Sequence, residues 1–135
     1  MTRQELLDEW LRRLEAPESV QFHRAMADAD GPGRCCLGHA CEAYIALGGQ
    51  LEIRHGEKGG QGLRSYNGEY MILPSPVIEA LGLSSASGEY YVNRVHGHAI
   101  AECLSHDNDS GLTLPEIART VRARPQGLFK EEGEA

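Results

Sequence analysis

The 135-residue sequence lacks several features that would identify a class of protein directly. It has no apolar run close to the roughly 20 residues that a transmembrane helix needs. No apolar signal-peptide core follows the polar N-terminus, which begins Met1-Thr2-Arg3-Gln4-Glu5. We therefore expect no membrane association and a cytoplasmic location. In that compartment the four cysteines should remain free thiols.

Basic residues are also too few for an ordinary nucleic-acid-binding protein. The chain has 13 Lys and Arg against 20 Asp and Glu, for a net charge of −7, whereas neutralisation of phosphates supplies most nucleic-acid affinity. The strongest basic stretch, residues 119–124, is short, so a regulator that binds nucleic acid through this helix is only a third hypothesis. An acidic domain is better suited to a basic surface on a protein partner.

The length, the hydrophobic content of 41% and the charged content of 24% are those of one globular domain. Apolar spacing and capping signals predict helices over residues 3–16, from 34–38 to just before Gly48, 75–81, 98–105 and 114–121. The first helix carries Trp10 on its apolar face, which indicates core packing or, alternatively, an interface anchor.

Strand signals are fewer and shorter than helix signals. Residues 51–54 alternate in polarity and predict a strand, and residues 90–95 are a second candidate strand. Asn67-Gly68 predicts a type I′ hairpin between residues 63–66 and 69–73. The Gly-rich segment 55–62 is expected to be a turn or loop. Taken together, the chain is predicted to be an α+β domain over residues 1–125, with helices packed on a short antiparallel sheet or hairpin. Residues 126–135 are predicted to form an acidic, disordered tail.

The most conspicuous cluster of reactive side chains comprises Cys35, Cys36, His39 and Cys41. Three thiols and an imidazole suggest a zinc site, but there is no second pair of ligands at knuckle spacing elsewhere in the chain. A cysteine nucleophile at a helix N-terminus is a further possibility. Buried cysteines acting as small apolar residues explain the cluster better, so we assign no metal, no cofactor and no catalytic residue.

Two other polar clusters have simple structural explanations. On the predicted helix 98–105 and its extension, His98, Glu102 and His106 share one face, which suits either a metal or a solvated surface. The segment 107–111 is similar to the start of a calcium loop, but the twelfth position is Ala118 where a bidentate Glu is needed. Asx side chains that cap a turn explain this segment better. No phosphate-binding loop or dinucleotide fingerprint is present.

Three stretches of the sequence form a recognisable combination of motifs. The first is Arg34-Cys35-Cys36-Leu37-Gly38 with Cys41-Glu42, and the last is Asn108-Asp109-Ser110-Gly111-Leu112-Thr113 with Glu116-Ile117-Ala118. A partial Leu-Pro-x-x-Val motif lies between them at Leu73, Pro74 and Val77. Together they resemble a group of small proteins from tailed bacteriophages. The resemblance implies a phage accessory gene and a cytoplasmic setting in an infected bacterium. It implies no catalytic residue, and Asp107 and Leu114 depart from the pattern of the group.

We therefore expect a non-catalytic accessory protein that binds and modulates or inhibits a host or defence complex, such as RNA polymerase, a nuclease effector or a CRISPR complex. Tyrosines are natural anchors in such interfaces, and the candidates are Tyr66, Tyr70, Tyr90 and Tyr91. Covering of the sheet is the alternative role for these four side chains. The alternative function is a small Cys/His-dependent enzyme or zinc-binding protein that uses the Cys35–Cys41 helix.

Overall fold

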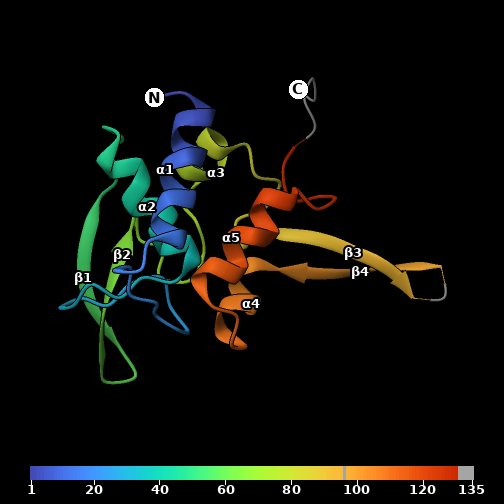
Figure 1. Cartoon of the computed structure of the whole chain (residues 1–135). Coiled ribbons are helices and arrows are strands. Elements are labelled where there is room, and N and C mark those ends of the chain that lie inside the picture. The colour runs from blue at the N-terminus through green and yellow to red at the C-terminus, as the bar shows by residue number, and fades with distance from the viewer. Residues whose placement is uncertain (96, 131–135) are drawn as a thin grey trace.

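Helices pack around two separate antiparallel hairpins in the computed structural model, which describes residues 1–95 and 97–130. The elements in chain order are α1 (Arg3–Glu15), α2 (Cys36–Ala46), β1 (Ile53–Lys58), β2 (Gln61–Tyr66), α3 (Ser75–Leu81), β3 (Glu89–Val95), β4 (His98–Cys103), α4 (Leu104–Asp109) and α5 (Leu114–Ala123). The protein is a small α+β domain, as the sequence predicts. Figure 1 shows that the β3–β4 hairpin extends away from the helices, so the core lies among the helices and at the bases of the hairpins.

Helices whose ends carry a capping signal form where the sequence predicts them. Thr2 and Glu5 make both hydrogen bonds of a capping box at the start of α1, and Thr113 and Glu116 do the same for α5. Gly82 follows α3 in the left-handed conformation, with φ of 72°. The predictions that α3 and α5 begin near residues 75 and 114 are therefore confirmed.

The first hairpin differs from the predicted one. β1 pairs with β2 through the turn at Gly59-Gly60, so the segment expected to be a loop forms half of the two strands. Asn67 and Gly68 do form a turn with positive φ at both residues, but the chain after Glu69 does not return as a strand. Most of β1 is exposed, so it carries no apolar alternation that could reveal it in the sequence.

The predicted helix over residues 98–105 is also wrong. Residues 98–103 form β4, and α4 begins only at Leu104. Ala99 and Ala101 are small enough for either conformation, and the choice is made by β3, whose Tyr91 and Val92 pair with Ala101 and Ile100. Consequently His98, Glu102 and His106 do not share a helix face.

The core is organised around the first turn of α2. The indole of Trp10, which is fully buried, donates a hydrogen bond to the carbonyl of Cys36 at 2.8 Å. The thiol of Cys36 donates to the carbonyl of Leu104, and the N–H of Cys36 donates to Oδ1 of Asn108 at 3.2 Å. Trp10 is thus a core residue, and hydrogen bonds of the single residue Cys36 connect α1, α2 and α4.

Asn108 uses both ends of its buried amide. Its Oδ1 also accepts from Gln21 Nε2 at 2.9 Å, and its Nδ2 donates to the carbonyl of Phe22 at 2.8 Å. Through Asn108, these bonds connect the irregular segment after α1 to α2. Buried backbone N–H and carbonyl groups need hydrogen-bond partners, and Asn108 supplies them here. The two motifs that carry the phage resemblance therefore contact each other.

Gly38 allows the segment before α2 to lie directly against the helix. A Cβ at this position would stand 2.1 Å from the carbonyl oxygen of Met26. That same oxygen accepts a hydrogen bond from the N–H of Cys35 at 2.9 Å. The glycine of the Cys-Cys-Leu-Gly motif is therefore required by a close approach of backbone to backbone.

The chain after α5 packs back onto the domain. Leu128 is fully buried, and Phe129 forms a bridge with Leu83 beside the end of α3. The predicted disordered tail is therefore wrong for residues 126–130, because the apolar pair Leu128-Phe129 covers the core. The remainder of that prediction, residues 131–135, lies outside the described residues.

We expect Asn108→Ala to lower the free energy of unfolding by about 3 kcal/mol, because it leaves buried backbone groups of Cys36 and Phe22 without partners. Urea denaturation followed by circular dichroism measures this change. Asn67→Ala is the control, since it removes an amide that binds the backbone N–H of Glu52 at an exposed turn. A loss at Asn108 no larger than that of the control would contradict the role of Asn108 in joining the two motifs.

Candidate protein-binding site

The candidate site is built on β3 and β4, which we call the ribbon. Its base is held firmly: the hydroxyl of buried Tyr90 donates to Oδ2 of Asp107, and the N–H of Leu104 donates to the carbonyl of Gly88. Burial and the nearby Asp107 carboxylate raise the pKa of Tyr90, so its hydroxyl stays protonated and donates this bond. The ribbon therefore leaves the domain in a defined direction.

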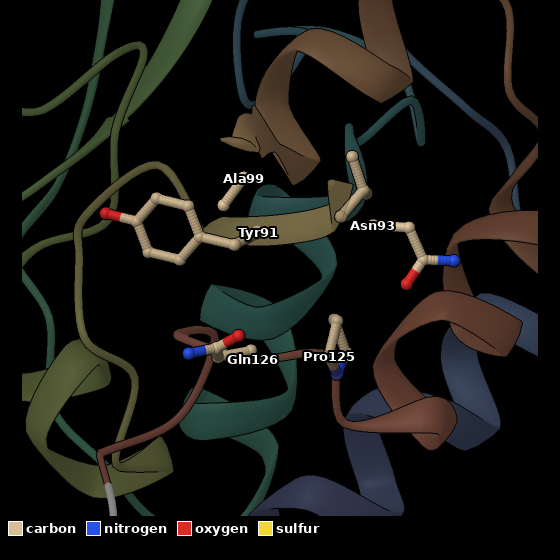
Figure 2. Close-up of a pocket in the computed structure, with 6 residues that line it drawn as sticks. Tyr91, Asn93, Ala99, Pro125 and Gln126 are labelled. Atoms are coloured by element: carbon tan, nitrogen blue, oxygen red, sulfur yellow. The ribbon is translucent and has the colours of Figure 1, made fainter. Parts of the chain in front are cut away.

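A groove lies between the ribbon and the chain that follows α5. The N–H of Tyr91 donates to the carbonyl of Gln126 at 2.7 Å, which places this segment beside the outer edge of β3. Figure 2 shows Pro125 and Gln126 opposite the strand that carries Tyr91 and Asn93. The groove has a volume of about 640 Å³, and its lining residues are Tyr91, Val92, Asn93, Ala99, Pro125 and Gln126.

Large apolar side chains on the ribbon are exposed to solvent. Tyr91, Val92 and Ile100 are 44%, 38% and 40% exposed, respectively. The ring of Tyr91 is held against the chain at Gly127, where an added Cβ would come within 2.7 Å of the ring. A partly immobilised aromatic side chain loses little conformational entropy on binding, so Tyr91 is suited to anchor a partner.

The other three tyrosines named as candidates are placed differently. Tyr66 is fully buried and its hydroxyl donates to Glu42, so it is not a surface anchor. Tyr90 is only 6% exposed and supports the ribbon from inside. Tyr70 is half-buried, with Nζ of Lys58 5.2 Å from its ring centroid. The structure does not bring these side chains together with Tyr91 in one surface.

Glu42 is the centre of a partly buried charge network. Arg34 Nε lies 3.0 Å from its Oε2, Arg64 lies 3.6 Å away, and the Tyr66 hydroxyl donates to the same oxygen. Burial alone would raise the pKa of Glu42, but the Tyr66 hydroxyl and the two guanidinium groups lower it overall. Burial and Glu42 together raise the pKa of Tyr66. This network fastens α2 to β2 and has the properties of a structural element.

The cysteines and His39 of α2 have separate surroundings. Cys35 Sγ accepts the N–H of Gly38 at 3.4 Å, Cys41 is fully buried, and Nε2 of His39 lies 3.2 Å from the carbonyl of Val20. Within the described residues, no group of three or more His, Cys, Asp or Glu side chains is arranged to hold a metal ion. This arrangement favours the interpretation of the cysteines as buried packing residues.

The thiols of α2 differ in acidity because their surroundings differ. Burial would raise the pKa of Cys35, yet the hydrogen bond from Cys36 and the N–H groups of Gly38 and Leu37 lower it overall. The pKa of Cys36 is raised by its interaction with Cys35 and by burial. Burial also raises the pKa of Cys41 well above its usual value. No histidine nitrogen is hydrogen-bonded to a cysteine in the described part of the chain, so no nucleophile and base are paired there.

The basic last helix does not present a free cationic stripe. Arg122 makes a bidentate ion pair with Glu15 of α1, with distances of 2.7 and 2.6 Å. The guanidinium of Arg124 lies over the ring of Phe129 at 4.4 Å. The basic stretch 119–124 contains three arginines, Arg119, Arg122 and Arg124. Two of them therefore make contacts within the domain, which weakens the hypothesis of nucleic-acid binding.

Comparison of the chain with protein-family models, with curated protein sequences and with solved structures finds no match. None of the described helices has both the length and the apolar character needed to cross a membrane.

Several residues of the groove were not identified from the sequence. Ala99 was assigned to a helix, and Gln126 was assigned to a disordered tail. The apolar pair Leu128-Phe129 was the available signal, since two adjacent large apolar residues after a helix indicate a segment that docks on the core. No local signal indicates that Pro125 and Asn93 face each other.

We expect Glu42→Gln to destabilise the protein by about 2 kcal/mol at neutral pH, because Arg34 loses its charged partner. Because the folded-state pKa of Glu42 is lowered, its contribution is present above the ordinary carboxyl pKa and is lost as the pH falls through the folded value. The difference between wild type and variant should therefore shrink below about pH 4. Urea denaturation from pH 3 to 7 measures it, with Glu52→Gln as a control in the exposed Glu52–Arg54 pair. A constant difference across this range would contradict the assignment.

We expect thiol labelling of the native protein to be fast at Cys103 and slow at Cys41. Cys103 ends β4 and is half-buried, whereas Cys41 is fully buried with a raised pKa, and only thiolates react. The helix that the sequence predicts over residues 98–105 would place Cys103 on a buried apolar face and make its thiol inert, so this expectation is corrected together with the helix. Mass spectrometry after a timed alkylation measures each site, and equal rates at both thiols would show that β4 is misplaced.

Proposed function

We propose that this protein is a phage-encoded accessory protein that binds, and thereby modulates or inhibits, a protein complex of the infected bacterium without catalysing a reaction. RNA polymerase, a nuclease effector and a CRISPR complex are examples of such targets. The phage setting and the cytoplasm of the host cell are supported by the Cys-Cys-Leu-Gly and Asn-Asp-x-Gly resemblance. The protein-binding role is supported by the surface of the ribbon.

The observation that carries the proposal is the exposure of Tyr91 beside a groove at the edge of β3. A 44% exposed aromatic ring, held by Gly127 and flanked by Pro125 and Gln126, resembles the anchor-and-pocket arrangement of binding hot spots. A peptide or loop from the partner would lie in the groove and contact this ring. The resulting interface would gain from Tyr91 being already ordered.

Charge supports the same proposal. The chain has a net charge of −7, and acidic side chains such as Asp8, Glu52, Glu57 and Glu79 are exposed. Such a surface accelerates association with a basic partner and repels nucleic acid. A protein surface that normally holds nucleic acid is the kind of partner that fits this charge.

The Cys/His cluster that suggested an enzyme or a zinc site makes its contacts within the fold. The thiol of Cys36 donates to the carbonyl of Leu104, Cys35 Sγ accepts the N–H of Gly38, and Nε2 of His39 lies 3.2 Å from the carbonyl of Val20. These contacts leave the small Cys/His-dependent enzyme and the zinc-binding protein with little support among the described residues. The ribbon carries the stronger case because Tyr91, Val92 and Ile100 remain partly exposed to solvent.

We expect Tyr91→Ala to reduce recovery of the partner at least tenfold, because loss of a hot-spot aromatic costs more than about 1.4 kcal/mol. Tagged wild-type and variant proteins are incubated with lysate of a susceptible bacterium, and captured proteins are quantified by mass spectrometry. Tyr70→Ala is the matched control, since Tyr70 is half-buried, follows the end of β2 and does not line the groove.

The wild type should enrich one defined complex that Tyr70→Ala also captures and Tyr91→Ala does not. The association rate should fall between about 0.05 and 0.3 M salt, because screening weakens attraction between exposed charges. Equal recovery by wild type and Tyr91→Ala would contradict the groove as the binding surface. Unchanged melting temperature of the variants confirms that folding is intact.

A further inference from the structure

The outer edge of β4 is an unpaired strand edge. Because the N–H of Tyr91 points away from β4 to Gln126, Tyr91 and its opposite residue Ala101 form a pair without mutual hydrogen bonds. The N–H and carbonyl of Ala101 therefore point away from β3. The register shift between Val92 and Val95 adds a residue to β3 and none to β4, so those of Ala99 also point away by the two-residue period of β4. Among the described residues, no backbone or side-chain group is bonded to this edge.

The ribbon also lacks a cover for its apolar side chains. Val92 and Ile100 lie directly opposite each other in the register and are 38% and 40% exposed. Two-stranded ribbons are marginally stable on their own, and antiparallel sheets normally bury at least one face. Strand β4 contains no Lys or Pro, the residues that usually protect a free edge from pairing.

The sequence of β4 is self-complementary in the antiparallel sense. It runs His98-Ala99-Ile100-Ala101-Glu102, with a basic group and an acidic group at equal distances from a central Ile. When two copies pair about Ile100, His98 of each faces Glu102 of the other. The outward groups of Ala99 and Ala101 then meet in hydrogen-bonded pairs, which the orientation of this edge requires.

We propose that two copies of this chain associate through β4 in an antiparallel, two-fold manner centred on Ile100, to form a four-stranded sheet in the order β3-β4-β4-β3. The central Ile side chains meet as a close, non-hydrogen-bonded pair, with Val92 beside each of them on the same face. A register centred on Ala101 would instead oppose Ile100 to Glu102 twice. Charge and apolar complementarity therefore select the register at Ile100.

The geometry stops the assembly at two copies. The outer edge of β3 is occupied at Tyr91 by Gln126, so the new sheet offers no equivalent edge for a third copy there. Figure 1 shows the ribbon extending away from the helical body, which keeps the acidic bodies of the two copies apart. This inference does not depend on the proposed function, and it leaves the groove at Pro125 and Gln126 open in both copies.

Sedimentation equilibrium of the full chain at about 5 to 200 µM tests the association. The expected mass is twice the 14.8 kDa of one chain.

Glu102→Lys should weaken the dimer at least tenfold, and combining His98→Glu with Glu102→His should restore it, because the ion pairs are then exchanged. Ala101→Pro should also give a monomer, since it removes an outward N–H while keeping the bonds between β3 and β4. The control is Glu57→Lys, which makes the same charge change on β1. A monomeric wild type, or a dimer that persists in both Glu102→Lys and Ala101→Pro, would overturn the proposal.

Disulfide trapping tests the register directly. Ile100→Cys, made in a Cys103→Ser background and oxidised with oxidised glutathione, should form an interchain disulfide because the two-fold places both copies of this position side by side. Val92→Cys in the same background is the matched control, since Val92 is equally exposed but faces Ile100 of its own chain. Crosslinking that is equal at both positions, or absent at Ile100, would refute the register centred on Ile100.

Discussion

The structure depends on the hydrogen bonds that converge on the first turn of α2. The carbonyl of Cys36 accepts a hydrogen bond from the indole of Trp10, and the N–H of Cys36 donates to Asn108. The thiol of Cys36 donates to the carbonyl of Leu104. Helix N-termini expose N–H groups that need partners, and here the partner comes from a residue 72 positions away in the sequence. A single buried contact therefore closes the chain on itself and sets the position of α4, from which the ribbon is supported.

This use of polar side chains explains where binding can occur. Residues that suggest chemistry in the sequence, such as Cys36, Asn108 and Glu42, are consumed by contacts within the fold. The ribbon is different, because Val92 and Ile100 expose apolar surface that the domain itself does not cover. Exposed apolar surface of this kind supports the proposed association with another protein. In the two proposals the edges of the ribbon have different roles: β3 borders the groove with Gln126, and the outer edge of β4 pairs with a second copy.

Local signals in the sequence were sufficient to predict the ends of helices wherever a particular residue type satisfies a requirement of the nearby backbone. The capping boxes at Thr2 and Thr113 marked two helix starts, and Gly82 marked a helix end, because these side chains and φ angles act within one turn. The α+β class followed from the same signals. The sequence indicated Tyr91 as one of four candidate anchor tyrosines, but it did not show which of the four is exposed.

What the sequence by itself determined about this protein is therefore its class, the ends of its main helices and the chemistry available to it. Only the tertiary structure decided that residues 98–103 are a strand, because Ala99 and Ala101 take whichever conformation their neighbour β3 imposes. Tertiary contacts also buried Tyr66 on Glu42 and left Tyr91 exposed beside Gln126. The physical reason is that burial and strand pairing are properties of distant segments brought together, and no local pattern records which segments meet.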